Sequence, residues 1–239
     1  MRRTPSLFWP TVFIACGILM LLGLGTWQVQ RLFWKEGLIA ERQAGVRAPP
    51  AALPSSLDAA RGLEYHHVNA TGTFLPDREL FLGASDREGH LGYHVIEPLR
   101  LASGAVLLVD RGFVPEDHKL PATRAAGEPR GEVTITGLLR LAPPEKPHWF
   151  LPDNTAERNY WFWIDIPGMT RAAGLEHVLP FYVDADATPN PGGLPVGGQT
   201  PLDLPNNHLQ YAITWYALAV VLAIMGFIFL RRRARGETT

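Results

Sequence analysis

The residue best suited to bind a metal stands in the stretch NNHLQYAITW, residues 206–215, directly before a long apolar run. His208 follows Pro205 and two asparagines, so we expect it in the first turn of a helix that one asparagine caps. Tyr211 and Trp215 follow at i+3 and i+7, which places them beneath His208 on one helix face. The pattern predicts an imidazole ligand above an aromatic wall suited to a flat macrocycle. The alternative is an interfacial aromatic belt with a histidine that bonds only headgroups or water.

A second group of candidate residues lies in GTWQVQRLFWK, residues 25–35. Gln28 and Arg31 fall at the end of another apolar run, at about the depth expected for the metal-binding histidine. Arg31 or Lys35 could pair with carboxylate groups of a ligand, and Gly25 could let that ligand approach the backbone. The alternative is that Trp27 is a belt residue and that the two cations extend to lipid phosphates.

Both groups of residues must be positioned by helices that cross a membrane. Residues 5–30 and 204–230 contain no charged side chain, and each stretch is long enough to span the hydrocarbon layer of about 30 Å. We predict transmembrane helices at 7–30 and 206–230. The first is expected to remain as an anchor, because the bulky Trp27 stands where a signal-peptide cleavage site would need small residues.

Charge is segregated along the chain and predicts its orientation. Six arginines against one glutamate give the tails, 1–6 and 231–239, a charge of +5, and the whole chain carries −1, so residues 31–205 carry −6. Basic residues beside a span stay in the cytoplasm. We therefore expect cytoplasmic tails and an exported middle, which in a bacterium means an inner-membrane protein with a periplasmic domain. Arg31 and Lys35 are the contrary, weaker signal.

The middle of the chain reads as one β domain reached through a helical stalk. Residues 31–45 continue the helical pattern, and 46–205 form the exported domain with its linkers, of which 51–62 is one. Strands are indicated by HHVNATGTF, LLVDRGFV, EVTITGLLR and FYVDA, with one helix near residues 166–174. The expected fold class is a membrane protein whose two transmembrane helices flank an antiparallel all-β domain, either a barrel or a sandwich.

Several classes of chemistry are excluded or lack support. Cys16 is the single cysteine, which excludes an intrachain disulfide, a covalent c-type haem site and a paired-thiolate copper site. Known enzyme motifs are missing, so we expect no enzyme, and an acidic exported domain does not suit nucleic acid. Asp110 and Arg111 should face opposite sides of a strand, and His94 reads as a core histidine. Residues 160–164, YWFWI, read as core or as a docking surface.

Taken together, these motifs resemble the Surfeit locus protein 1 family. The resemblance rests on Gly25-Thr-Trp27-Gln28 with Arg31 and Lys35, on LVDRGFVP and FLPDN in the middle, and above all on NNHLQYAITWYALA at the second span. Their order and spacing cover the whole chain. The family's histidine maps onto His208, and its W-Q-x-x-R element maps onto Trp27, Gln28 and Arg31.

The resemblance implies a cytochrome c oxidase assembly factor of the respiratory chain, a haem a chaperone acting between haem A synthase and oxidase subunit I. In that role His208 would bind the iron of a transiently held, non-covalent haem a. Tyr211 and Trp215 would line the ring, and Arg31 would face a propionate. The rival expectation is a scaffold without haem that docks on an assembly intermediate through the β domain, for example around Tyr160 to Trp163.

Overall fold

The computed structural model describes residues 7–86 and 88–235, so most of the two predicted cytoplasmic tails lies outside the described residues. The chain forms two compact units, and each is considered by itself. One unit is helical and consists of the chain up to Glu41 together with the chain from Asp203 onward. The other unit, Arg42–Leu202, contains every strand.

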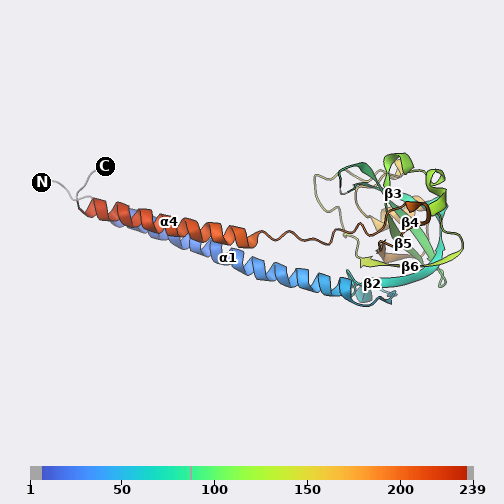
Figure 1. Cartoon of the computed structure of the whole chain (residues 1–239), viewed down its shortest axis with the longest axis horizontal. Coiled ribbons are helices and arrows are strands. Elements are labelled where there is room, and N and C mark those ends of the chain that lie inside the picture. Colours follow the sequence, from blue (N-terminus) through green and yellow to red (C-terminus); the bar gives the residue numbers. More distant parts are fainter. Residues whose placement is uncertain (1–6, 87, 236–239) are drawn as a thin grey trace. The chain divides into compact units, whose positions relative to one another are not determined.

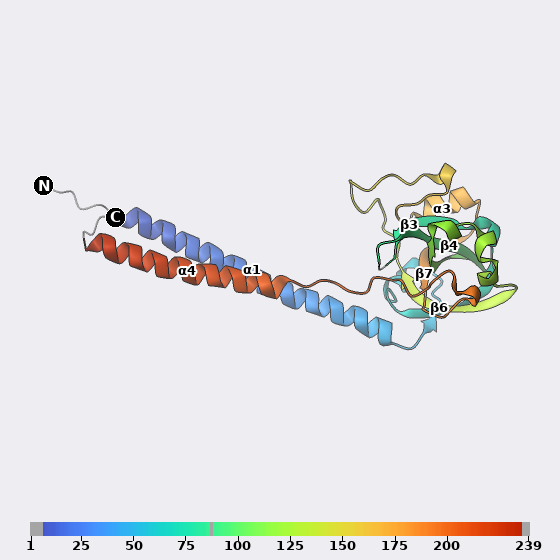
Figure 2. The ribbon, with the colours of Figure 1, turned by 45° about the horizontal axis from the view of Figure 1, so that its top comes forward.

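The helical unit contains two helices that pack side by side and antiparallel (Figures 1 and 2). α1 runs without interruption over Phe8–Arg47, and α4 covers His208–Ala234. Each carries an apolar window long enough to cross a membrane, and most of that surface is exposed to its surroundings. Exposed apolar surface on this scale suits a lipid environment, and the chain is a membrane protein with two transmembrane helices.

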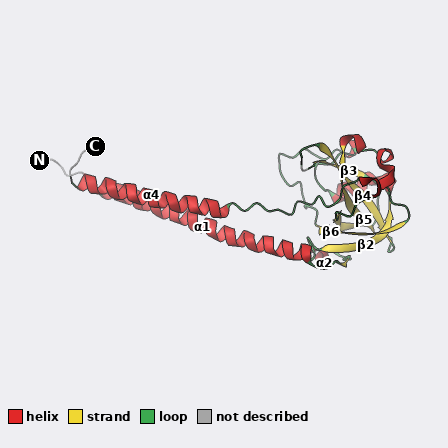
Figure 3. Ribbon diagram, in the orientation of Figure 1, coloured by secondary structure: helices red, strands yellow, loops and turns green. Residues whose placement is uncertain are grey.

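The other unit is a β domain, and Figure 3 distinguishes its strands from its short helices by colour. Its elements in chain order are β1 (Ala51–Ala52), α2 (Leu57–Arg61), β2 (His67–Phe74), β3 (Leu80–Ser85), β4 (Leu91–Leu101), β5 (Val106–Pro115), β6 (Glu132–Arg140), α3 (Ile166–Ala173) and β7 (Val178–Ala185). The predicted helix near 166–174 is α3. The stretch 51–62, predicted as a linker, instead holds β1 and α2, because Ser56 caps the short helix through the Ala59 N–H at 3.3 Å.

The strands close into a barrel, which answers the question that the sequence left open. β2, β6, β7, β5 and β4 follow one another in the sheet, and β4 pairs back onto β2. β3 extends the sheet beyond β4, and β1 lies beside β2. The flanking helices and all-β domain are as predicted, but β5–β7 and β1–β2 are parallel pairs within an otherwise antiparallel sheet.

The central strand β5 is buried on both faces, and this explains its nearly continuous apolar sequence. Leu107 and Val109 belong to a core with Phe181, whereas Leu108 packs in a second core with Trp161 and α3. Alternate residues of β5 therefore serve two different cores. Trp161 is only 1% exposed and Ile164 is also buried, so these two residues are core, whereas Tyr160, Phe162 and Trp163 between and beside them are half-buried.

A buried ionic network also lies in the barrel domain. Arg111 on β5 donates to Glu97 on β4 at 2.7 Å, and it also contacts Glu128. Arg124 donates to Glu79 and to Glu128. The predicted separation of Asp110 from Arg111 is confirmed, because Asp110 faces the other side of the strand and binds His94.

Candidate functional site

His208 is the first residue of α4, as the sequence predicted for a candidate ligand. Asn207 occupies the N-cap position, but its side chain makes no capping hydrogen bond. Instead, the side-chain oxygen Oδ1 of Asn206 accepts a hydrogen bond from the His208 N–H at 3.4 Å. The histidine is half-buried. A side chain at this place is fixed at the start of a long helix and keeps part of its surface exposed.

The imidazole of His208 is held by the other helix. Its Nδ1 lies 2.7 Å from Oε1 of Gln28 on α1. An amide oxygen can only accept, so Nδ1 carries the proton and Nε2 keeps its lone pair. Fixing the second ring nitrogen in this way is how proteins orient a metal-binding histidine. The sequence placed Gln28 and His208 at the same depth, and the structure joins them directly.

Small residues bring the two helices together below this pair. A Cβ added to Gly25 would stand 2.7 Å from the Tyr216 ring, and the Thr26 hydroxyl lies 3.1 Å from the Tyr216 hydroxyl. Further along, Gly226 faces Ile14. Gly25 therefore admits a helix–helix contact and not a ligand, which corrects the role suggested for it from sequence.

The predicted aromatic wall is only partly assembled. Trp215 is half-buried, but Tyr211 is 55% exposed and Trp27 is 51% exposed. The aromatic ring at the helix contact is Tyr216, which the sequence analysis missed. The sequence feature that could have indicated this contact is the series of small residues Ala212, Ala219 and Gly226, which recur at intervals of seven. They are the buried positions of α4 and define the face that packs.

The two predicted cations have different surroundings. Lys35 donates to the backbone oxygen of Pro205, and so holds the chain that enters α4. The Arg31 guanidinium stacks over the Trp34 ring at 4.2 Å. Among the described residues Arg31 makes no ion pair, and its N–H groups are open to an anion. Of the two, Arg31 is the cation available to a carboxylate ligand.

These features define a class: a membrane protein in which two apolar helices bracket a β-barrel domain and carry a glutamine-oriented histidine between them. A sequence model described as the SURF1 family matches residues 15–220. The chain belongs to the SURF1 family.

Individual members of the family match most of the chain. It is 42% identical to a SURF1-like protein of Monosiga brevicollis, over 97% of this chain and 90% of that protein. It is also 39% identical to Surfeit locus protein 1 of Mus musculus, over 88% of this chain and 72% of that protein. The Homo sapiens protein of that name is likewise 39% identical, over 86% of this chain and 72% of its own length.

Sequence reasoning also missed a set of polar side chains in the barrel domain. His94, expected to be an ordinary core histidine, bonds Asp110 at 2.6 Å, and Arg140 pairs with Asp184 at 3.0 Å. All four line one cavity. They come from four different strands, so local spacing gave no sign that they meet.

Proposed function

We propose that the protein is a cytochrome c oxidase assembly factor that binds haem a through His208 and aids its insertion into oxidase subunit I. The proposal rests on membership of the SURF1 family and on the resemblance of Trp27, Gln28, Arg31 and His208 to that family's motifs. The structure contributes the arrangement of those four residues on two neighbouring helices.

The observation that carries the proposal is the bond between His208 and Gln28. Because Gln28 fixes the proton on Nδ1, the free lone pair is on Nε2, the atom that would bind iron. A histidine that merely bonded headgroups would not need a partner on the other helix. The residues present therefore fit a haem that His208 would hold through Nε2, and the group would supply redox chemistry only after delivery to the oxidase.

The surroundings of His208 also suit an amphipathic ligand. The apolar helices offer a lipid-like environment for the long hydrocarbon tail of haem a, which avoids the cost of exposing that tail to water. Arg31, stacked on Trp34, is placed to pair with a propionate. Trp215 and the exposed rings of Tyr211 and Trp27 can contact the macrocycle.

A carrier must also release its cargo. If His208 alone held the haem, the group would be exchanged more readily than from a site with two protein ligands, which would suit transfer from haem A synthase to oxidase subunit I. The charge of the arginine-rich tails supports cytoplasmic tails and a periplasmic barrel domain in a bacterial inner membrane. No catalytic role is part of this proposal.

The test is a visible absorption spectrum of the whole protein, purified in detergent from cells that make haem A. The wild type should carry haem a, and His208→Ala should lose it while its far-UV circular dichroism is unchanged. Gln28→Leu should weaken haem retention by about 10-fold to 100-fold, the usual effect of removing a partner that orients a metal-binding histidine. Gln30→Leu is the matched control, because Gln30 lies on the same helix and is exposed.

The second candidate is a scaffold without haem, and one observation favours it. Trp149 is 92% exposed and Phe150 is also exposed, on a loop closed by a Lys146–Asp153 ion pair of 2.7 Å. Such a tip can dock on a partner. Haem-free wild type, combined with loss of oxidase assembly in Trp149→Ala and normal assembly in His208→Ala, would establish the scaffold and refute haem carriage.

A further inference from the structure

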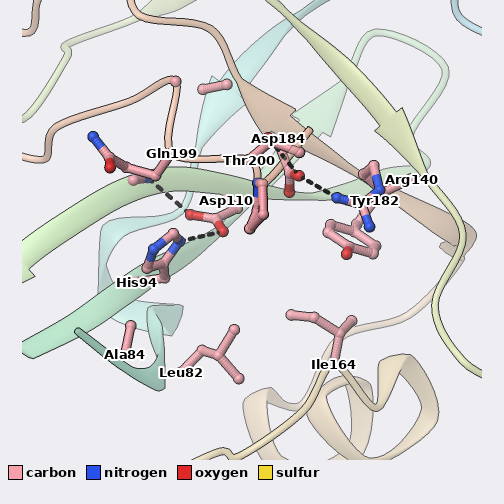
Figure 4. A pocket seen from close by; sticks show the side chains of 14 residues that line it. Leu82, Ala84, His94, Asp110, Arg140, Ile164, Tyr182, Asp184, Gln199 and Thr200 are labelled. Carbon is pink, nitrogen blue, oxygen red and sulfur yellow. Dashed lines mark hydrogen bonds and ion pairs between the residues drawn. The ribbon is translucent and has the colours of Figure 1, made fainter. Parts of the chain in front are cut away.

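A cavity of about 250 Å³ lies against the outer wall of the barrel, over strands β4 to β7 (Figure 4). One side of it is polar and is formed by four titratable residues, each from a different strand: His94, Asp110, Arg140 and Asp184. The opposite side is apolar and includes Leu82, Ala84 and Ile164 (Figure 4). Its volume lies below the range of about 300–1,000 Å³ typical of drug-sized ligands, so it suits a small molecule or one side chain and not a haem.

Asp110 is the first acidic group of the polar side. One of its oxygens accepts from Nδ1 of His94 at 2.6 Å, and the other accepts from the Gly112 N–H at 2.8 Å. Each carboxylate oxygen has a second lone pair. Asp110 is therefore fixed in place and can still accept a further hydrogen bond.

Asp184 is the second acidic group and stands beside the first, since the two residues are paired in register on β5 and β7. Its Oδ2 accepts from Arg140 at 3.0 Å and from the Thr200 hydroxyl at 2.8 Å. Among the described residues, Oδ1 of Asp184 has no hydrogen-bond partner. Arg140 also lies over the Tyr65 ring, so its charge is shared between Asp184 and that ring, while its buried Nε has no hydrogen-bond partner among the described residues.

Tyr182 provides an independent sign that the cavity takes a ligand. The residue is 8% exposed, and within residues 7–86 and 88–235 its hydroxyl makes no hydrogen bond. Figure 4 shows the hydroxyl directed into the space between the charged residues and Ile164. The rest of the residue is enclosed, and its free hydroxyl can accept a hydrogen bond from a donor bound in the cavity.

We propose that this cavity binds a primary ammonium group carried on a short aliphatic stem. The three donors of an ammonium match the free acceptors on Asp110, Asp184 and Tyr182. The stem would lie against Leu82, Ala84 and Ile164. Such a group could belong to a free amine or to a lysine side chain of a partner protein, and the site would serve either one by the same contacts.

Charge decides between this ligand and the other classes. Two carboxylates and Arg140 leave one negative charge when His94 is neutral, and a monovalent cation balances it. An anion would meet both carboxylates. A metal ion is not favoured, because the possible ligand atoms of His94, Asp110 and Asp184 do not all lie within 4.8 Å of one another.

Protons should compete with the ammonium group. Burial raises the pKa of Asp184 to about 6, and the neighbouring Asp110 charge adds to this, while Arg140, Thr200 and His94 oppose it. Burial lowers the pKa of His94, but the Asp110 carboxylate outweighs this and raises it overall, with Asp184 adding to the increase. Acid therefore neutralises one carboxylate and charges the imidazole. Affinity for an amine should rise as the pH increases from 5 to 7.5.

The test uses the full chain in lipid nanodiscs, with n-butylamine as the probe and isothermal titration calorimetry as the measurement. We expect saturable binding at pH 7.5 that weakens at pH 5, and no binding of n-butanol. Asp184→Asn and Tyr182→Phe should each lower the affinity, Asp184→Asn by about 10-fold, the usual result of losing a charge-assisted hydrogen bond. Asp153→Asn is the matched control, since that exposed aspartate lies outside the cavity.

A second probe distinguishes the two sources of the amine. N-acetyl-lysine methylamide carries the same ammonium group on a peptide-like backbone. If it binds as well as n-butylamine, the cavity is open to a partner's lysine; if only n-butylamine binds, the ligand is a free amine. If neither probe binds, or if the cavity variants bind as the wild type does, the proposal is wrong. Circular dichroism of each variant guards against misfolding, and Tyr182→Phe retains the ring and so the packing.

Discussion

The helix pair and the barrel hold their polar groups in opposite ways. The helices touch through glycine and alanine, with a few side-chain bonds between them, such as His208 to Gln28 and Thr26 to Tyr216. The barrel buries whole ion pairs, including Arg111 with Glu97. In a lipid environment close backbone packing stabilises helix association, whereas a water-exposed domain can surround charges with a folded sheet.

Candidate residues can be found from sequence spacing on the helices but not in the barrel. On the helices, each candidate residue is defined by its distance along one helix from its neighbours. In the barrel, the residues that meet belong to different strands, and only sheet closure brings them together. The two regions should therefore respond differently to substitution, the barrel by loss of folding and the helices by loss of their mutual contact.

The largest effect is expected inside the barrel domain. Trp161→Ala should lower the free energy of unfolding by about 3–5 kcal/mol, because the ring is buried and its removal leaves a cavity. Trp149→Ala should change it by less than about 0.5 kcal/mol, since that ring is exposed. Urea unfolding of the whole protein in detergent, followed by circular dichroism, measures both. A small effect of Trp161→Ala would show that this stretch is not core.

The next effect is a dependence of barrel stability on pH. Burial raises the pKa of Glu97 from 4.5 to about 7, although Arg111 opposes the shift. Between these values the unfolded chain releases a proton that the folded chain retains. The stabilisation is therefore complete below pH 4.5 and is lost as the pH rises through 7, by up to about 3–4 kcal/mol at about 1.4 kcal/mol per pKa unit.

Glu97→Gln isolates this effect because it removes the titrating group and keeps an oxygen for Arg111. Unfolding free energies at pH 5 and pH 7 should differ more for the wild type than for the variant. Asp184 also has a raised pKa, but it titrates in both the wild type and the variant, so its effect on the unfolding free energy cancels when the two are compared. Equal differences for the two proteins would mean that Glu97 is ionised throughout this range.

The sequence predicts the helices well because their signals are local. An uncharged run sets each span, and an asparagine pair sets the start of α4 at His208. The contact made by Tyr216 could not be predicted, because the face of α4 that packs on α1 depends on both helices. From His208 alone, Tyr211 and Trp215 share its face, but the contact with Gly25 selects Tyr216.

The strands were predictable from apolar alternation, but their partners were not. The parallel pairing of β5 with β7 joins residues about seventy positions apart, and it is this pairing that sets Asp110 beside Asp184. A lone histidine in an apolar strand gives no local sign of an aspartate on the next strand. The polar cavity was therefore beyond sequence reasoning, although each of its strands could be assigned.

The helix contact itself should show an intermediate effect. Gly25→Ala places a methyl group against the Tyr216 ring, and we expect it to weaken association of the helices by about 1–3 kcal/mol, as overpacking does elsewhere. Gly23→Ala is the matched control, because nothing lies within 4 Å of its added Cβ. Resistance to SDS denaturation in mixed micelles measures the difference. Equal behaviour of the two variants would mean that α1 and α4 do not pack through Gly25.

The smallest effect concerns the hydroxyl pair below the histidine. Thr26 and Tyr216 bond across the helices at 3.1 Å, and interhelical hydrogen bonds of this kind contribute about 0.6 kcal/mol on average. Thr26→Val and Tyr216→Phe should each cost about that amount, and the double variant should cost little more than either single one. The same SDS titration provides this double-mutant cycle. Strictly additive losses would show that the two hydroxyls do not interact, and the helices would then associate through packing of small residues and the His208–Gln28 bond alone.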